Sequence, residues 1–207
     1  MRMANAMTTC RIPATTCRFA VESPGMQATT QPPPDSGKDA WRRWLRSQLE
    51  TDPAAGEKIR LEIAGILAAL PPSRIAAFSG MADEPDLWPL VEEGHGHEWL
   101  MPRIDGAGLV FHPMKSRTDG IAGVFGIIEP LASAPAVHPA EIDLVLCPEL
   151  GFGRDLTRIG RGKGFYDRLL AQLRPGTPIV GVAYPCRIVD SVPTDAHDIP
   201  MTRVIGV

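Results

Sequence analysis

Apolar side chains recur at helical spacing in two stretches near the start of the chain. The first stretch predicts a helix that Asp35 or Ser36 can cap and that ends at about Leu49. The second predicts a helix over Pro53–Leu70, where two prolines stop it. Each helix therefore needs a partner surface for its apolar face.

Shorter apolar runs, bounded by turn-forming residues, predict buried strands further along the chain. A short helix is also expected between residues 86 and 130. The predicted strands are Arg74–Phe78, Trp99–Pro102, Leu109–Met114, Asp143–Pro148, Ile179–Tyr184 and Val204–Val207. Helices that alternate with buried strands indicate an α/β domain with a mostly parallel central sheet.

The length of 207 residues suits one compact domain with its own core. The 21 lysines and arginines against 24 acids give a net charge of −3, which argues against nucleic acid or an acidic membrane as the partner. No run approaches the roughly 18 apolar residues of a membrane span. The 4 cysteines lack the C-x-x-C spacing of zinc sites. We therefore expect a soluble, cytoplasmic protein.

Residues 1–36 are short of large apolar side chains and rich in threonine, alanine and proline. Such a segment cannot offset its ordering entropy, so we predict a flexible or disordered extension before a domain over residues 37–207. Arginines precede the first acid, Glu22, which gives a faint similarity to an organelle transit peptide. A start codon assigned too far upstream, with Met26 as the true start, is a simpler explanation.

The clearest chemical signal is the run RIGRGKGFYDR over residues 158–168. Glycines alternate with cations, and an apolar-periodic segment then continues until Pro175, which predicts a loop that opens onto a helix. Residues without Cβ let a ligand approach the backbone N–H groups, and the helix start adds partial positive charge. From Arg158 to Arg174 there are 5 cations and 1 acid. We interpret this segment, the glycine loop, as a phosphate site.

Each charged side chain of the glycine loop suits one task at a phosphate. Arg158 and Arg161 can bind oxyanions through two parallel hydrogen bonds, whereas Lys163 acts as a mobile point charge. Asp167 lies in the first helical turn, and among these cations it should stay ionised. It is placed to hold Mg²⁺ against phosphate oxygens.

The spacing of the glycine loop also allows an alternative, a solvated surface loop before an ordinary amphipathic helix. A Walker A loop would need glycine at position 157 and serine or threonine at position 164, where Thr157 and Gly164 stand. A dinucleotide fingerprint would need glycine in place of Phe165. Spacing alone thus indicates phosphate and nothing more specific.

The segment PELGF over residues 148–152, followed by RIGRGKGFYD, closely resembles the signature of the 5-formyltetrahydrofolate cyclo-ligase family, also called 5,10-methenyltetrahydrofolate synthetases. Met101–Arg103, Gly126–Pro130 and Ser191–Pro200 resemble further family segments in the same order. The resemblance covers residues 38–207. It implies a single three-layer α/β domain, similar to the NagB/RpiA/CoA-transferase-like architecture.

The resemblance also implies ATP and Mg²⁺ as cofactors, and 5-formyltetrahydrofolate, polyglutamylated or not, as the substrate. Arg161 and Lys163 are then the expected catalytic cations, and Asp167 and Asp198 the expected metal ligands. The implied nucleotide contacts are Arg42, Arg46, Arg158, Gly160, Arg161, Gly162, Lys163, Gly164, Phe165 and Tyr166. The implied substrate contacts are Glu84, Ser79, Arg161, Lys163 and Phe165.

Without the resemblance, several of these residues have plainer interpretations. Arg42 and Arg46 can form a solvated helix face, although they match the family's K-x-x-L-R element with arginine in place of lysine. Phe165 and Tyr166 can equally pack in the core. Asp198 alone is an ordinary loop acid.

Four positions depart from the family pattern: Glu149 and Leu156 replace glycines, Gly153 replaces an aspartate and Arg187 replaces a glutamine. Gly153, Leu156 and Arg187 motivate one rival interpretation, a paralogue that binds nucleotide or folate without turnover. A second rival is a nucleic-acid binder that uses the glycine loop, but the aromatic and basic residues form no extended face for it. The leading hypothesis is a monomeric ATP-dependent cyclo-ligase without nucleic-acid or membrane partners.

Overall fold

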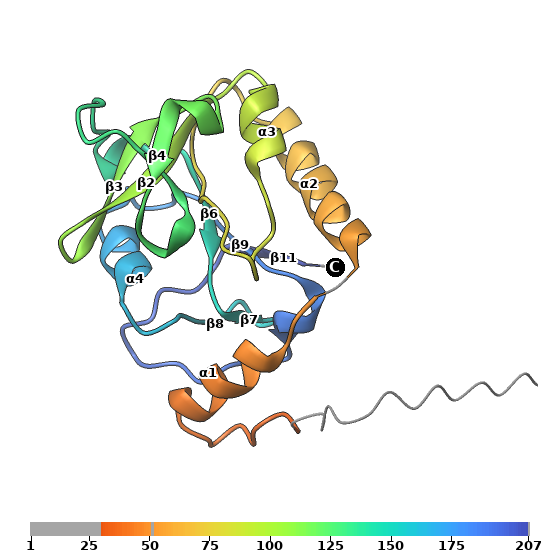
Figure 1. Ribbon diagram of the computed structural model, residues 1–207. Helices are drawn as coiled ribbons and strands as arrows, with labels where there is room; N and C mark the ends of the chain where they lie inside the picture. The colour runs from red at the N-terminus through yellow and green to blue at the C-terminus, as the bar shows by residue number, and fades with distance from the viewer. Residues whose placement is uncertain (1–29, 51, 207) are drawn as a thin grey trace, which may run out of the picture.

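The computed structural model describes residues 30–50 and 52–206. Its centre is a six-stranded sheet in the order β11-β9-β6-β1-β2-β3 (Figure 1). The strands are β1 (Arg74–Ala76), β2 (Glu98–Asp105), β3 (Gly108–Pro113), β6 (Leu144–Pro148), β9 (Ile179–Val182) and β11 (Arg203–Ile205). All neighbours are parallel except β2 and β3. The predicted α/β fold with a mostly parallel sheet is confirmed.

Both faces of the sheet are covered, as β6 illustrates. Leu144 and Leu146 join one core cluster, whereas Val145 and Cys147 join another. Because neighbouring side chains of a strand point to opposite faces, a continuous apolar run is buried on both sides. Helices α2 (Pro53–Ala68) and α3 (Trp88–Glu93) supply the first cluster, and α4 (Phe165–Leu170) supplies the second (Figure 1). The three predicted layers are thus present.

Helix α1 (Lys38–Ser47) packs elsewhere, on a three-stranded sheet in the order β10-β7-β8 (Figure 1). Its strands are β7 (Gly151–Gly153), β8 (Arg158–Ile159) and β10 (Ile188–Val189). Buried Trp41 and Leu45 pack there against Leu150 and Ile159. The sequence pattern did not predict this sheet, because strands of two or three residues carry no readable alternation. The packing brings α1 against the glycine loop.

The remaining elements are two short strands and four 3₁₀ helices among the described residues. Strands β4 (Gly120–Ala122) and β5 (Ile128–Pro130) form an antiparallel pair. Short 3₁₀ helices lie at Arg117–Asp119, Val124–Gly126, Pro139–Glu141 and Pro185–Arg187.

Several predicted helices and strands are longer than those in the structure. The first helix ends at Ser47 rather than at about Leu49, whose side chain is 64% exposed and so gains nothing from another helical turn. The first strand ends at Ala76, although Ala77 and Phe78 stay buried. Burial alone cannot distinguish a strand from the buried coil that follows it.

Most of the predicted extension over residues 1–36 lies outside the described residues. Within its described part, the Pro33 carbonyl accepts a hydrogen bond from Trp41 Nε1 at 3.2 Å. Across residues 30–50 and 52–206, no helix combines the length and the apolar character needed to cross a bilayer.

Candidate functional site

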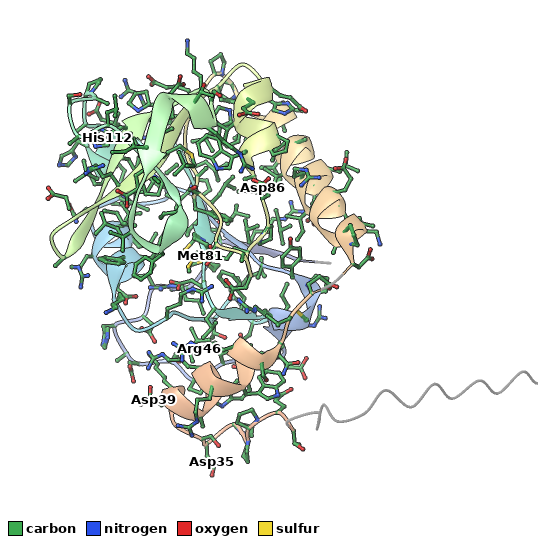
Figure 2. The ribbon with its side chains drawn as sticks, viewed as in Figure 1. Asp35, Asp39, Arg46, Met81, Asp86 and His112 are labelled. Atoms are coloured by element: carbon green, nitrogen blue, oxygen red, sulfur yellow. The ribbon has the colours of Figure 1, made fainter. Side chains whose placement is uncertain are left out.

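A pocket of about 570 Å³ opens at the carboxyl ends of β1, β2 and β6. Loops at this edge of a parallel sheet commonly carry ligand contacts in α/β proteins. Figure 2 labels two lining residues, Arg46 from α1 and Met81 from the loop after β1, which lies above α1 in this view. The lining includes every candidate residue from the sequence: Arg42, Arg46, Ser79, Glu84, Arg158, Gly160, Arg161, Gly162, Lys163, Gly164, Phe165, Tyr166, Asp167 and Asp198. What each residue binds stays a prediction.

The glycine loop runs from β8 into α4. The sequence predicts the loop and the helix but not β8. Gly162 and Gly164 have φ angles of 97° and 66°, a region that side chains with a Cβ adopt only under strain. Helix α1 holds the loop from outside, since Arg42 Nε donates to the Gly160 carbonyl at 3.0 Å. Arg46 Nη2 lies 3.5 Å from the Arg161 carbonyl. These two arginines therefore fix the loop's backbone, besides lining the pocket.

Arg158 lies in the wall of the pocket, with 4% of its side chain exposed. Its guanidinium donates to Glu149 Oε1 at 2.6 Å, to the Ile199 carbonyl at 3.0 Å and to Asp167 Oδ1. With these acceptors in place, Arg158 organises the pocket wall and has little capacity left for phosphate. We call Arg158, Glu149 and Asp167 the Arg158 cluster.

Glu149 is the buried acid of this cluster, with a side chain 7% exposed. Burial raises its pKa to about 7, although the charge and hydrogen bond of Arg158 act in the opposite direction. For Arg158, burial acts to lower the pKa, but the Glu149 charge and the Asp167 hydrogen bond outweigh it. Glu149 therefore titrates near neutrality inside a wall whose arginine stays charged.

Arg161, in the glycine loop, belongs to a second group of charges. Its Nη2 donates to Asp83 Oδ1 at 2.8 Å and to Glu84 Oε1 at 2.9 Å. Glu84 Oε2 also accepts from the Met81 backbone N–H at 3.0 Å. Glu84 is thus held in the loop after β1 by Arg161, one of the predicted catalytic cations.

Asp198 is paired with a cation that the sequence reasoning missed. Lys38 Nζ lies 2.6 Å from Asp198 Oδ2 and 2.7 Å from Asp195 Oδ2. Burial acts to raise the pKa of Asp198, but the hydrogen bonds from Lys38 and the Asp195 backbone, together with the charges of Lys38 and Arg158, outweigh it and hold that pKa below its usual value. Ligand atoms of Asp195, His197 and Asp198 lie within 4.8 Å of one another.

The donor set at this side of the pocket suits a hard cation. Asp167 and Asp198 both line it and offer carboxylate oxygens, the ligands that Mg²⁺ prefers. Each already faces a cationic side chain, Arg158 for Asp167 and Lys38 for Asp198. A metal ion would therefore compete with Lys38 for Asp198, and both ligand assignments stay predictions.

The opposite half of the pocket is apolar. Its side chains are Phe78, Met81, Pro102, Ile104, Leu109, Phe125 and Ile127. Phe125 stands out because it is 64% exposed and has a φ of 64°. A bulky residue in the left-handed region costs free energy, and here no core packing compensates for it. No sequence pattern indicated this residue, because an exposed aromatic side chain in a short irregular segment follows no periodicity.

Three predicted contact residues also have structural roles. Ser79 Oγ accepts from the Ile128 N–H at 3.0 Å and so connects the loop after β1 to β5. Tyr166 packs against the core cluster under α4, as the alternative interpretation allowed, and burial raises its pKa well above the usual value. Phe165 lies 5.6 Å from the Arg168 guanidinium, which covers its ring.

The departures from the family pattern are accommodated locally. A Cβ at Gly153 would lie 2.1 Å from Asp155 Oδ1, so the Asp155 carboxylate occupies the space beside that glycine. This carboxylate accepts from Thr157 Oγ1 at 2.5 Å. Leu156 has a φ of 72°, which explains why a glycine suits this position in the family. Arg187 is 2% exposed and donates to Asp83 Oδ2 at 2.7 Å.

Sequence reasoning missed Lys38, Asp83 and the role of Glu149. A signal for Lys38 existed, because Lys38, Arg42 and Arg46 are spaced four residues apart and share one helix face. No pattern signalled Asp83 or Glu149. Asp83 pairs with Arg161 and Arg187, which are far from it in the chain. Glu149 pairs with Arg158, which the sequence analysis assigned to nucleotide binding.

Comparisons with known proteins agree with this architecture. A family model described as the 5-formyltetrahydrofolate cyclo-ligase family matches residues 54–207. The NMR structure of Aquifex aeolicus 5,10-methenyltetrahydrofolate synthetase is similar, with a TM-score of 0.68 and 28% identity over 81% of this chain and 88% of that one. The Mycoplasma pneumoniae 5,10-methenyltetrahydrofolate synthetase has a TM-score of 0.64 at 22% identity, over 82% of this chain and 98% of that one, and shows the fold alone.

Curated relatives carry the same family name. The 5-formyltetrahydrofolate cyclo-ligase of Mycolicibacterium smegmatis is 36% identical over 86 residues, which span 41% of this chain and 44% of that protein. The Escherichia coli K12 protein of the same name is 28% identical over 63% of this chain and 76% of its own length. Since the family model also covers well over half of the sequence, this chain belongs to the 5-formyltetrahydrofolate cyclo-ligase family.

Proposed function

We propose that this protein is an enzyme that converts 5-formyltetrahydrofolate to 5,10-methenyltetrahydrofolate with consumption of ATP and Mg²⁺. The observation that carries the proposal is the division of one pocket into two halves. Lys38, Arg42, Arg46 and Lys163 lie in its cationic half, and aromatic and aliphatic side chains lie in its apolar half. A phosphate chain suits the first half, and the flat rings of a folate suit the second.

The formyl group needs activation because its oxygen is a poor leaving group. Transfer of the γ-phosphoryl group to that oxygen yields ADP and an O-phosphorylated formyl group that stays bonded to N5. N10 then attacks the formyl carbon, and loss of phosphate and of the N10 proton leaves the closed methenyl ring. Such transfers need in-line positioning and surrounding positive charge more than covalent help from the protein. Lys163 and the amides of Gly160–Gly164 would hold the transferring phosphoryl group. Asp167 and Asp198 would hold Mg²⁺, which would supply further positive charge.

The substrate would be oriented from the loop after β1. Glu84 would face the pterin, and Arg161 would lie beside the formyl group, since both side chains line the pocket and contact each other. Their mutual ion pair keeps Arg161 in one orientation before substrate enters. The positive charge of Arg161 would then already be in place when the folate binds, which lowers the free energy of the transition state.

Absorbance of the methenyl product tests the proposal directly. We expect product from 5-formyltetrahydrofolate only when ATP and Mg²⁺ are both present, with EDTA abolishing turnover. Tight ATP binding without product would favour the rival paralogue that binds without turnover. The local accommodation of Gly153 argues against that rival. The monomeric state and the cytoplasmic location stay predictions.

Phe125 offers a separate test of the apolar half. We expect Phe125→Gly to raise the KM for the folate by about tenfold, since burying an aromatic ring is worth about 1.5–3 kcal/mol when the contact is complete. The free energy of unfolding should stay level or rise by about 1 kcal/mol, because glycine tolerates the positive φ. Steady-state kinetics and urea denaturation measure the two effects. An unchanged KM would remove Phe125 from the folate site.

The exposed apolar residue Leu61 on α2 provides the matched control for this variant. Leu61→Gly should leave the KM within twofold, while it costs stability because glycine weakens a helix interior by about 1 kcal/mol. A rise in KM for both variants would indicate a general loss of structure rather than a lost contact.

A further inference from the structure

Behind the pocket wall, the structure contains a second buried arginine that the proposed chemistry does not use. Arg187 lies in the 3₁₀ helix after β9 with 2% of its surface exposed. Its Nη2 donates to Asp83 Oδ2 at 2.7 Å, and its Nε donates to the Gln48 carbonyl at the end of α1 at 3.1 Å. Arg187 thus joins the carboxyl end of α1 to the loop after β1.

Asp83 links Arg187 to Arg161, which lines the pocket. One carboxylate oxygen accepts from Arg187, and the other accepts from Arg161 at 2.8 Å. Burial would raise the pKa of Asp83, but the hydrogen bonds from Arg187 and Arg161 outweigh it and hold that pKa below its usual value. Asp83 is therefore an ionised bridge between two guanidinium groups, one in the wall and one in the pocket.

The charges of this group balance. Arg161 alone would face two carboxylates, Asp83 and Glu84, and the second arginine restores neutrality. Without Arg187, Asp83 would form an ion pair with Arg161 alone. The stronger attraction would draw the Arg161 guanidinium toward the wall. An uncharged residue at position 187 would also leave Asp83 Oδ2 without this donor.

We propose that Arg187 and Asp83 form a positioning pair that fixes the Arg161 guanidinium toward the substrate. This inference rests on the proposed function, in which Arg161 lies beside the formyl group. It assigns a task to Arg187, a buried residue that lies outside the pocket lining. The task is indirect, because Arg187 acts on the substrate only through Asp83 and Arg161.

The test compares Arg187→Gln, Asp83→Asn and the double variant. We expect each single change to lower kcat by about 10- to 100-fold, because a small misplacement of a catalytic group has effects of that size. The double variant should resemble the singles, since both changes remove the same pair. Arg187→Lys should recover part of kcat. Lysine keeps the positive charge, but it lacks the planar guanidinium that donates to both Asp83 and Gln48.

Arg203→Gln is the matched control, since Arg203 forms an exposed ion pair with Glu62 and lies outside the pocket. Rates are normalised to the number of ATP-binding sites, so that a folding defect does not count as lost catalysis. Arg187→Gln and Asp83→Asn with wild-type kcat would overturn the inference, as would fully multiplicative losses in the double variant. Should Arg187→Gln fail to fold, Arg187→Lys and Asp83→Asn decide the question by the same criteria.

The same experiment separates this inference from the proposed function. A wild-type protein that forms no methenyl product overturns the proposed function. In that case, the Kd for 5-formyltetrahydrofolate, measured by calorimetry, decides the inference. A Kd at least fivefold weaker in Asp83→Asn, with Arg203→Gln unchanged, supports the positioning pair, and equal values overturn it.

Discussion

Replacing Lys163 with methionine should lower kcat/KM by about 100-fold and weaken ATP binding by at least about tenfold, because a charge-assisted contact to phosphate is worth about 1.5–3 kcal/mol and strengthens as charge develops. The side chain is exposed at the pocket and makes no core contact, so the fold should survive. Methionine keeps much of the length of the side chain and removes only the ammonium group. Isothermal calorimetry with ATP and the methenyl absorbance assay measure the two effects.

The control for this variant is Lys58→Met, an exposed lysine on α2 outside the pocket. It should leave both parameters within twofold. Wild-type ATP affinity in Lys163→Met would show that the glycine loop is not the phosphate site. That result would remove the basis of the proposed function, since no other loop of the described residues combines glycines and cations in this way.

Replacing Arg158 with methionine should destabilise the protein by about 3–5 kcal/mol at pH 8, because it leaves the Glu149 carboxylate buried without a cation. The expected loss depends on pH. The pKa of Glu149, about 7, is above its ordinary value of 4.5, so its contribution to stability is complete at low pH and falls as the pH rises through 7. Removing Arg158 raises that pKa further. The destabilisation should therefore be clearly smaller at pH 5 than at pH 8.

Urea denaturation at the two pH values measures this effect. The double variant Arg158→Met with Glu149→Leu should recover much of the lost stability, because no charge then remains buried. Arg203→Met, which breaks an exposed ion pair, should cost less than about 1 kcal/mol. Equal losses at both pH values would show that Glu149 does not titrate inside the wall as its burial requires.

The family and the fold were predictable because their signals are local. The glycine run is continuous in the chain, and a strand covered on both faces is visible as an apolar run such as Leu144–Pro148. The small sheet under α1 was not predictable, since its strands have two or three residues. Helix and strand ends such as Ser47 and Ala76 depended on packing that the pattern does not encode.

For the site, the sequence alone indicated which residues could bear the chemistry, and the pocket lining includes all of those candidates. Tertiary structure decided how they are paired. Lys38 meets Asp198 across 160 residues of sequence, and Arg187 meets Asp83 across 104. Glycine spacing and apolar periodicity act over a few neighbouring positions, and so a linear pattern reveals them. Ion pairs between distant segments exist only once the sheet order has brought those segments side by side, and so their partners could not be identified in advance.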